Sequence, residues 1–353
     1  MSIALSILAL GFLIVVHEGG HYFVARWCGM RVERFSLGFG PAIPGLKWRS
    51  KKTGTQFQIA PIPFGGFVEI RGMNIAEDID PEDKFAYPNR PAWQRFLTIL
   101  AGPATNYLSA VVIAMVLFTC AGMRSQTAHI GVDSILPGYD AMGKLLPGDR
   151  IQEIDKVPVL ATDKISLTER VSAKQGAPII VTVLRDGKQL EVAITPKLGP
   201  DKDDKGNPIY LLGIQKTIQT ELVDVGILTA AKSAIVYPVV TTQAIASGLY
   251  DIFTGAQKAD PGGPKRIIDE FSKSFGHSFY RGIELLMLLS VYLGLFNLFP
   301  LPALDGGRLV FLSYELITRR RANPKIEAMV HMGGIMVLGV VMILVTLRDF
   351  GVF

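Results

Sequence analysis

Residues 3–27 read IALSILALGFLIVVHEGGHYFVARW, an apolar stretch that carries a polar motif, HEGGH, at positions 17–21. A membrane-crossing helix needs about 20 mostly apolar residues, and this stretch has that length. A secretory signal peptide is the alternative for an apolar run at an N-terminus. The run lacks the basic start and the small-residue cleavage site of such a peptide. We therefore expect it to be a membrane span of the mature protein.

The HEGGH motif predicts a metal site. Residues four apart share a helix face, so the imidazoles of His17 and His21 can reach one cation with Glu18 beside it. Zinc accepts two His nitrogens and one carboxylate and keeps a fourth position for water, and a nearby carboxylate can move that water's proton. A chance match is the alternative interpretation. The membrane setting argues against chance, because polar groups in a span are costly and mark functional sites.

The third ligand has one strong candidate, in residues 297–308, which read NLFPLPALDGGR. Two prolines and a Gly pair interrupt the helical pattern there, and irregular backbone at membrane depth is tolerated where it lines a cavity or is buried in protein. Asp305 is the acidic residue of this segment. It could instead cap the following helix, since Asp-Gly-Gly is also common in turns. Beside a motif that lacks its third ligand, we favour Asp305 as a zinc ligand.

The composition indicates a membrane protein with several spans. Of 353 residues 49% are hydrophobic and 19% are charged, and the charges gather between long apolar runs. Three further runs, at about 96–122, 283–299 and 328–347, have the length of a span. The net charge of +5 is located mainly beside these runs, unlike the concentrated basic face of a nucleic-acid-binding protein.

The orientation follows from Lys and Arg near the span ends, which favour the cytoplasm. The loops after spans one and three carry most of these residues, whereas no Lys or Arg precedes span one. We therefore expect both termini and the long middle segment outside the cytoplasm, and the motif near the cytoplasmic side. The basic residues are Arg26, Arg31, Arg34, Arg90 and Arg95 in the first group and Arg308, Arg319, Arg320, Arg321 and Lys325 in the second.

The middle segment has the pattern of a soluble domain followed by a polar linker. Residues 179–184 and 190–194 predict two strands joined by a turn at 185–188. Residues 201–207 are charged and rich in turn formers. Residues 222–254 are apolar but interrupted, so an amphipathic helix on the membrane surface is favoured over a fifth span.

These motifs together resemble the site-2 protease family of intramembrane zinc metalloproteases, in particular the group of the bacterial regulator of sigma-E protease. The resemblance covers nearly the whole chain. It implies that His17, His21 and Asp305 bind zinc, that Glu18 is the general base, and that Asn297 and Pro302 line the substrate cleft.

Two further elements resemble this family. Residues 38–41 and 56–69 are similar to its membrane-associated β-hairpin, whose edge strand pairs with an unwound substrate; Gly65, Gly66 and Phe67 would then bind substrate. A plain soluble hairpin is the alternative. Gly102, Pro103 and Asn106 are similar to its Gly-Pro-x-x-Asn element, where a direct substrate contact and a packing kink are both open.

A third element, LPGDRI at residues 146–151, resembles the bacterial PDZ signature. Only about one PDZ domain fits, whereas enterobacterial members of the family carry two, and the segment before the signature departs from the family pattern. Whether this domain binds a peptide or excludes substrates with bulky ectodomains is left open.

The predicted fold is a polytopic α-helical membrane protein with about four transmembrane helices, a membrane-associated β-hairpin and one extracytoplasmic PDZ domain. The expected parts are a first membrane section at 1–123, the PDZ domain at 124–200, a linker with the surface segment at 201–281, and a second membrane section at 282–353.

The predicted function is zinc-dependent endoproteolysis of single-span membrane proteins, with anti-sigma factors or remnant signal peptides as the substrate class, in the bacterial inner membrane. We expect a monomer in the bilayer and no nucleic-acid partner. One rival is an inactive membrane scaffold, which the intact Glu18 disfavours. Another is a metal transporter, which would need more acidic or His residues in the spans, where only Glu284 is found. His129, His277 and His331 are expected to have no role in the site.

Overall fold

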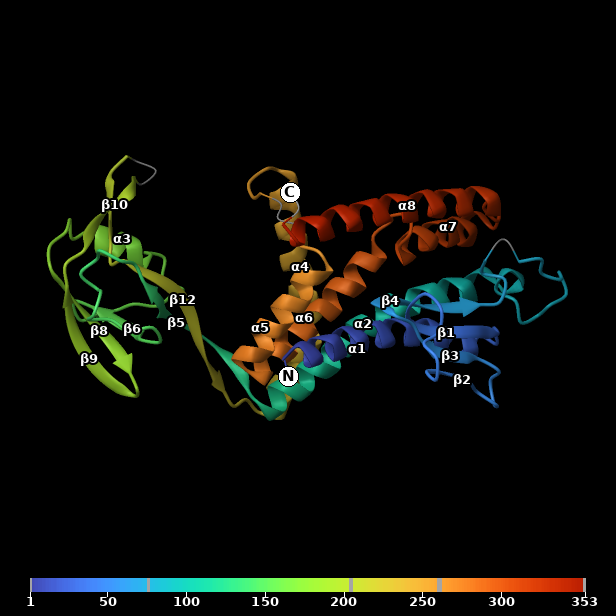
Figure 1. Ribbon diagram of the computed structural model, residues 1–353, viewed down its shortest axis with the longest axis horizontal. Coiled ribbons are helices and arrows are strands. Elements are labelled where there is room, and N and C mark those ends of the chain that lie inside the picture. Colours follow the sequence, from blue (N-terminus) through green and yellow to red (C-terminus); the bar gives the residue numbers. More distant parts are fainter. Residues whose placement is uncertain (1, 75–76, 203–205, 259–261, 352–353) are drawn as a thin grey trace. The chain divides into compact units, whose positions relative to one another are not determined.

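Among the described residues, four helices are long and apolar enough to cross a membrane (Figure 1). They confirm the four predicted runs, with ends that differ by a few residues. These helices are α1 (Ser2–Trp27), α2 (Ala92–Cys120), α6 (Phe279–Leu298) and α8 (Pro324–Asp349).

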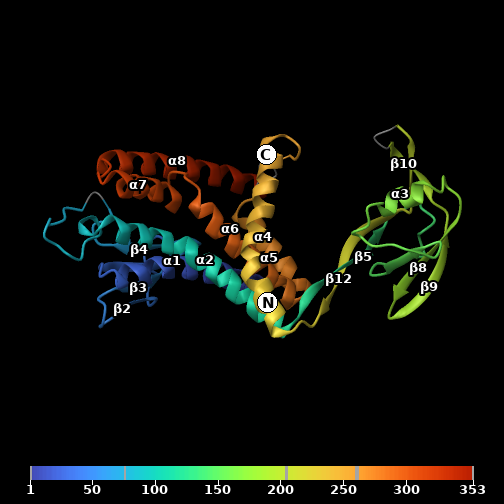
Figure 2. The same ribbon diagram turned by 180° about the vertical axis from the view of Figure 1, so that it is seen from behind.

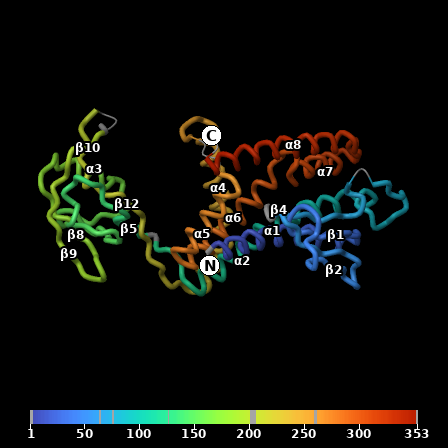
Figure 3. The backbone as a smooth tube through the Cα atoms, viewed as in Figure 1, coloured from blue at the N-terminus to red at the C-terminus, as the bar shows by residue number. Residues whose placement is uncertain are grey.

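The structure is a computed structural model that describes residues 2–74, 77–202, 206–258 and 262–351, and the chain forms two units. The membrane unit comprises residues 1–120 and 226–353, and the second unit comprises 121–225. The second unit therefore extends beyond the predicted limit of residue 200. The reason is that a late strand, β12 (Ile214–Val223), pairs antiparallel with β5 (Met123–Ile135), the first strand of that unit (Figure 3).

The helix α1 ends where the chain reaches a glycine. Gly29 has φ +75°, a conformation that is easy only for glycine. The N–H of Met30 then donates to the carbonyl of Ala25 at 2.8 Å, which satisfies one of the last helical carbonyls. The reversal directs the chain straight into the sheet that lies beside α1.

The sheet of the membrane unit has four strands in the order β2-β3-β1-β4. Both segments of the predicted hairpin lie in this sheet, but the 56–69 run forms two strands that pair with opposite edges of residues 32–39 and not with each other. The N–H of Ala60 donates to the carbonyl of Leu37 on β1, which carries the chain across β1 before β4 begins. The strands are β1 (Val32–Phe39), β2 (Lys47–Arg49), β3 (Gln56–Ile59) and β4 (Ile62–Ile70).

The apolar segment at 222–254 contains one continuous helix, α4 (Ile227–Phe253), which is not among the four candidate spans. It packs on α2 and crosses it, as Figure 2 shows, and the hydroxyls of Tyr107 and Thr242 hydrogen-bond at 3.1 Å. Its place at the membrane surface stays a prediction. The remaining helices of this unit are η1 (Tyr87–Asn89), α5 (Pro264–His277) and α7 (Asp305–Thr318).

The described residues of the second unit form a six-stranded sheet, a separate two-stranded sheet and one short helix. The predicted turn at 185–188 is confirmed: Asp186 and Gly187 both have positive φ, as a two-residue hairpin requires. The core is formed by residues such as Ile151 and Val181, which are fully buried. The other elements are β6 (Arg150–Ile154), β7 (Val157–Pro158), α3 (Leu167–Ser172), β8 (Ile179–Arg185), β9 (Lys188–Ile194), β10 (Lys197–Lys202) and β11 (Pro208–Leu211).

Asp149, from the LPGDRI signature, has a structural role in this unit. Its buried carboxylate accepts two hydrogen bonds of 2.7 Å from the Arg185 guanidinium and one of 2.8 Å from the Leu146 N–H. Burial alone would raise the pKa of Asp149, but these bonds outweigh it and hold the pKa below its usual value. The aspartate thus fixes the loop before β6 to strand β8.

Candidate metal centre

Three of the predicted site residues meet in the membrane unit. His17 and His21 lie one turn apart on α1, and Asp305 is the first residue of α7. The Oδ2 atom of Asp305 lies 3.2 Å from the Nε2 atom of each imidazole, and the two Nε2 atoms are 3.3 Å apart. The helices α1 and α7 therefore bring the three donor atoms together, although Asp305 is distant in sequence.

The geometry of these donors fits a zinc ion. Zinc bonds of about 2.0–2.2 Å in a tetrahedral site separate neighbouring donors by roughly 3.3–3.5 Å. The observed separations of 3.2 to 3.3 Å are close to that value. The Oδ2 atom of Asp305 is also buried and has no hydrogen-bond partner among the described residues, which is costly for a carboxylate unless a cation faces it. A zinc ion held by these three donors would keep one position for water.

The Nδ1 atoms of both imidazoles contact polar groups on α2. The Nδ1 atom of His21 lies 2.8 Å from the carbonyl oxygen of Thr98, so Nδ1–H donates and the Nε2 lone pair faces the other donors. The Nδ1 atom of His17 lies 3.0 Å from the carboxamide of Asn106. The atom of Asn106 at this distance is Nδ2, and its Oδ1 is buried without a partner among the described residues. Metal binding through Nε2 of His17 would require a proton on Nδ1, and turning the carboxamide over would give that proton the Oδ1 acceptor. Asn106 thus contacts a predicted zinc ligand.

The helices α1 and α2 approach each other through two glycines. A Cβ atom on Gly102 would lie 2.2 Å from Nε2 of His21, so a side chain there would occupy the metal site. A Cβ atom on Gly20 would lie 2.3 Å from the Ala101 carbonyl oxygen. Small residues allow this close backbone approach between membrane helices. The two glycines inside HEGGH are not equivalent, because only Gly20 faces α2 closely.

We expect Gly20→Ala to push α1 away from α2, because its new methyl group meets backbone atoms that cannot move independently. Overpacking of this kind costs about 1–3 kcal/mol. Gly19→Ala is the matched control, since its Cβ atom would approach only the Phe23 ring, at 3.8 Å. Thermal unfolding and zinc content of the purified chain in detergent measure both variants. Equal losses in the two variants would contradict the close contact.

The third donor follows a bend after α6. Pro300 and Pro302 lack the N–H that a helix requires, and the chain turns at Ala303, whose φ is +78°. The helix α7 then begins with Leu304 as its N-cap, with no side-chain capping bond. Asp305 therefore does not cap α7 through its side chain, and its carboxylate faces the two imidazoles instead.

A buried ion pair connects α7 to α2. The Arg95 guanidinium donates to the Glu315 carboxylate and lies 5.9 Å from the centre of the Tyr87 ring. Burial raises the pKa of Tyr87 to about 12, so its phenol stays neutral. This pair fixes the helix that begins with Asp305 to the helix that supports both imidazoles.

Glu18 lies against the edge strand β4, which runs beside α1 (Figure 3). The N–H of Val68 donates to the Glu18 carboxylate. A Cβ atom on Gly66 would lie 3.1 Å from Cγ of Glu18, so glycine at this position leaves room for the glutamate. In an antiparallel strand the N–H and C=O of a residue face the same edge, and the edges alternate along the strand. The backbone groups of Gly66 and Val68 therefore face away from β1.

The predicted substrate-binding residues on β4 divide between its two faces. Gly66 lies toward Glu18, whereas Gly65 and Phe67 lie on the other face against Phe39. The Phe39 and Phe67 rings are stacked with centres 6.4 Å apart. Of these three residues, the structure brings only Gly66 into contact with a predicted catalytic residue.

The other two predicted substrate-binding residues make local contacts. The Asn297 side chain donates to the Leu293 carbonyl of its own helix at 2.9 Å. Pro302 packs against Gly334 of α8, where a Cβ atom would lie 2.3 Å from the Pro302 Cβ atom. Their predicted contact with substrate stays a prediction.

Sequence reasoning missed His331. It was expected to have no role, yet it is buried, and the N–H of Ala303 donates to its Nδ1 atom at 3.3 Å. A polar residue within an apolar run was a signal for it, since such residues are costly in a span. His129 contacts Arg150 in the second unit, and His277 is exposed and contacts the Lys273 carbonyl, away from the metal site.

A protein-family model described as peptidase family M50 matches residues 5–341 of the chain. Several curated proteins named "putative zinc metalloprotease" are similar over most of their length. One from Mesorhizobium japonicum is 33% identical and covers 92% of each chain. One from Brucella suis is 33% identical over 86% of this chain and 83% of its own. One from Agrobacterium fabrum is 31% identical over 97% of this chain and 94% of its own.

Proposed function

The chain belongs to peptidase family M50 and is a zinc metalloprotease, and from that premise we propose that it cuts peptide bonds within the membrane. Its substrates are single-span membrane proteins, of which anti-sigma factors and remnant signal peptides are the expected class. One observation carries the proposal. His17, Glu18 and His21 lie on a helix that is long and apolar enough to cross a membrane, and Asp305 of α7 meets the two imidazoles there.

The residues of the site divide the work of amide hydrolysis. His17, His21 and Asp305 would hold the zinc ion, which would supply Lewis-acid activation of a water molecule and of the scissile carbonyl group. Glu18 accepts a proton from the attacking water and passes it to the nitrogen of the departing amine. Thr98 and Asn106 keep the two imidazoles oriented.

The edge strand β4 is our candidate for presenting the substrate. A peptide bond inside a helix is inaccessible, so a transmembrane segment has to be unwound before it is cut. An extended segment can replace its lost backbone hydrogen bonds by adding to a free sheet edge. The edge of β4 runs past Glu18, and the outward groups of Gly66 and Val68 lie beside the carboxylate.

We expect a cysteine at Phe67 to crosslink to an added substrate strand. In a Glu18→Gln background with Cys28 and Cys120 replaced, Phe67→Cys should form disulfides with substrate cysteines at every second position, because side chains alternate along a strand. Trp48→Cys on β2, the opposite edge of the same sheet, is the matched control and should not crosslink. Disulfides scored on gels give the pattern. Crosslinks without that period, or equally strong at Trp48, would argue against strand addition.

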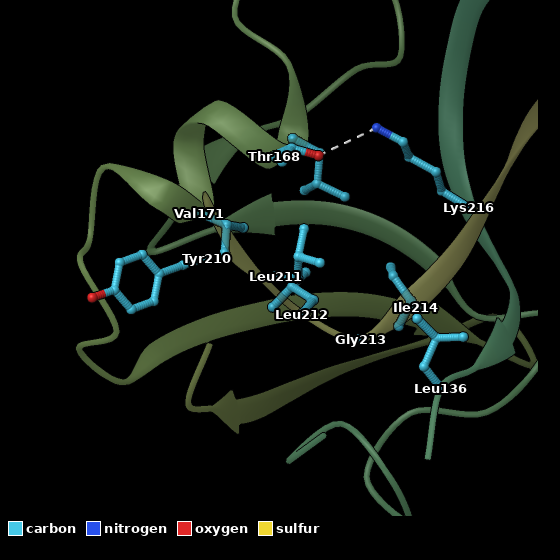
Figure 4. Close-up of a pocket in the computed structure, with 10 residues that line it drawn as sticks. Leu136, Thr168, Val171, Tyr210, Leu211, Leu212, Gly213, Ile214 and Lys216 are labelled. Carbon is cyan, nitrogen blue, oxygen red and sulfur yellow. Dashed lines mark hydrogen bonds between the residues drawn. The ribbon is translucent and has the colours of Figure 1, made fainter. Parts of the chain in front are cut away.

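The second unit has an apolar groove that favours peptide binding over passive exclusion. A cavity of about 60 Å³ lies between α3 and the start of β12. Figure 4 shows the side chains that line it. Small-molecule pockets are about 300–1,000 Å³, so this cavity suits one apolar side chain. The strand β12 is also the edge of its sheet. We propose that this unit is the PDZ domain and that an extended peptide adds to β12.

Filling this groove separates the two proposed roles of the unit. We expect Thr168→Trp, which places a bulky ring at the groove, to abolish binding of labelled peptides to the full chain. It should leave the exclusion of substrates with large ectodomains unchanged. Thr195→Trp, whose residue does not line the cavity, is the control. Retained peptide affinity in Thr168→Trp would favour a filter that binds no peptide.

We propose the inner membrane of a bacterium as the location, with both termini outside the cytoplasm and the metal site near the cytoplasmic face. The clusters of Arg and Lys in the loops after spans one and three support this orientation. We also propose that the chain acts as a monomer.

The rivals make different predictions about residues. A scaffold does not need Glu18, whereas a protease does, and the proximity of this carboxylate to the donor set supports the protease. A transporter needs a path of polar groups. Among the described residues, one group of three His and acidic side chains has donor atoms close enough to share a cation, and it comprises His17, His21 and Asp305.

Trapping tests the substrate class. We expect the purified Glu18→Gln chain to retain uncut substrates, and mass spectrometry of the co-purified membrane proteins to find single-span proteins enriched over the wild type. Recovery of multi-span or soluble proteins alone would refute the proposed class.

A further inference from the structure

Helix α8 is attached to the rest of the membrane unit through few residues. Its side chains are exposed or partly exposed along nearly the whole helix, as expected of a lipid-facing span, and His331 is its single buried residue. A histidine is a costly choice for the one buried position of such a helix. Its partners therefore indicate what this contact is for.

The partner of His331 is the bend that precedes Asp305. The Ala303 N–H donates to Nδ1 of His331 at 3.3 Å. Ala303 has φ +78°, a conformation that a residue with a side chain adopts only when its surroundings impose it. Ala303 lies two residues before the zinc ligand, so the hydrogen bond secures a strained backbone next to Asp305.

The other end of the imidazole has no partner. Because Nδ1 accepts a hydrogen bond, the neutral ring carries its proton on Nε2, and this atom is buried without a hydrogen-bond partner among the described residues. An unpaired buried donor is unfavourable. The acceptor at Nδ1 is thus the one polar contact of this ring that the described structure shows.

Two glycines bring α8 and α7 close to the same bend. A Cβ atom on Gly334 would lie 2.3 Å from Cβ of Pro302, and one on Gly307 would lie 3.2 Å from Cε1 of His331. Gly333, the neighbour of Gly334 in sequence, has open space around it. The contact is therefore specific to one face of α8. In Figure 1, α8 lies beside α7, the helix that Asp305 begins.

We propose that His331 is a positioning residue that holds the bend at Ala303 and thereby sets Asp305 for zinc binding. This inference rests on the proposed zinc site. It makes the fourth span part of the metal centre, although α8 supplies no ligand. The chemical requirement is a hydrogen-bond acceptor at the position of Nδ1.

Two pairs of variants of the full chain in detergent test the proposal. His331→Leu removes the acceptor, whereas His331→Asn offers an amide oxygen near the position of Nδ1. Gly334→Ala forces α8 off Pro302, whereas Gly333→Ala adds the same methyl group in open space. His277→Leu controls for loss of an exposed histidine.

The readouts are the zinc affinity, from competition with a chelator, and the visible spectrum of the cobalt-substituted chain, which reports the coordination geometry. We expect His331→Leu and Gly334→Ala to weaken zinc binding about 10- to 100-fold, as for other groups that orient ligands. We expect His331→Asn and Gly333→Ala to keep the wild-type affinity and spectrum.

Three outcomes would overturn the proposal. If the wild type binds zinc tightly and His331→Leu binds it equally tightly, the role of His331 is refuted. The proposed zinc site is then unaffected. Equal losses in His331→Leu and His331→Asn show that the ring matters for packing and not as an acceptor. A wild-type chain that binds zinc no better than Asp305→Ala removes the metal site of the proposed function, and the role of His331 with it.

Discussion

Replacing Glu18 with glutamine should abolish cleavage of a single-span substrate while leaving zinc bound. Glutamine keeps the size of the side chain and can still meet the Val68 N–H, but it cannot accept a proton from water. A missing general base lowers a rate by about 10²–10⁴-fold. Cleavage of a tagged substrate by the purified chain, followed over time, measures the loss.

The control for Glu18→Gln is Glu284→Gln on α6, which removes another carboxylate from a span. It should cut at the wild-type rate. Metal analysis of the same samples should find as much zinc in Glu18→Gln as in the wild type. Cleavage by the Glu18→Gln chain at the wild-type rate would refute the role of Glu18 as the general base. An inactive Glu18→Gln chain that lacks zinc would show that Glu18 supports the structure of the site.

Asp305→Ala should leave the chain largely free of zinc. The Oδ2 atom of Asp305 is the only donor of the site that does not come from α1, and it faces both Nε2 atoms at 3.2 Å. Without it only two neutral imidazoles remain as donors. The loss of zinc affinity should therefore exceed the roughly 10- to 100-fold loss that follows removal of a hydrogen-bond partner of a metal ligand. Metal analysis of the purified protein measures this, and activity should fall with zinc content.

Asp269→Ala, on the exposed face of α5, is the matched control for Asp305→Ala. It should bind zinc and cut substrate as the wild type does. Full zinc occupancy in Asp305→Ala would show that the third ligand is another residue. The meeting of the first residue of α7 with the two imidazoles of α1 would then not form the metal centre.

The sequence predicted the long apolar helices and the three side chains that meet, His17, His21 and Asp305, because these depend on local patterns. A run of apolar residues specifies a span by its length, and HEGGH specifies two ligands by the helical period. Asp305 could be predicted because prolines and glycines interrupt an apolar run at that point. The fold in turn excluded the alternative of a capping side chain.

The unpredicted features depend on contacts between distant segments. The sheet order β2-β3-β1-β4 could not be predicted from the alternation of polar and apolar residues. That alternation indicates which face of a strand each side chain occupies, but not which strands are neighbours. The difference between Gly19 and Gly20 appears only when α2 is in place. His331 contacts a bend formed by another element, so its spacing in the sequence gave no sign of a partner.

The most direct test of the account is to identify the bond that is cut. The full chain is reconstituted in proteoliposomes with a single-span substrate, and the masses of both products are measured with and without a zinc chelator. We expect one zinc-dependent cut within the membrane segment, absent in Glu18→Gln. A cut outside that segment, or one that persists after zinc is removed, would contradict it.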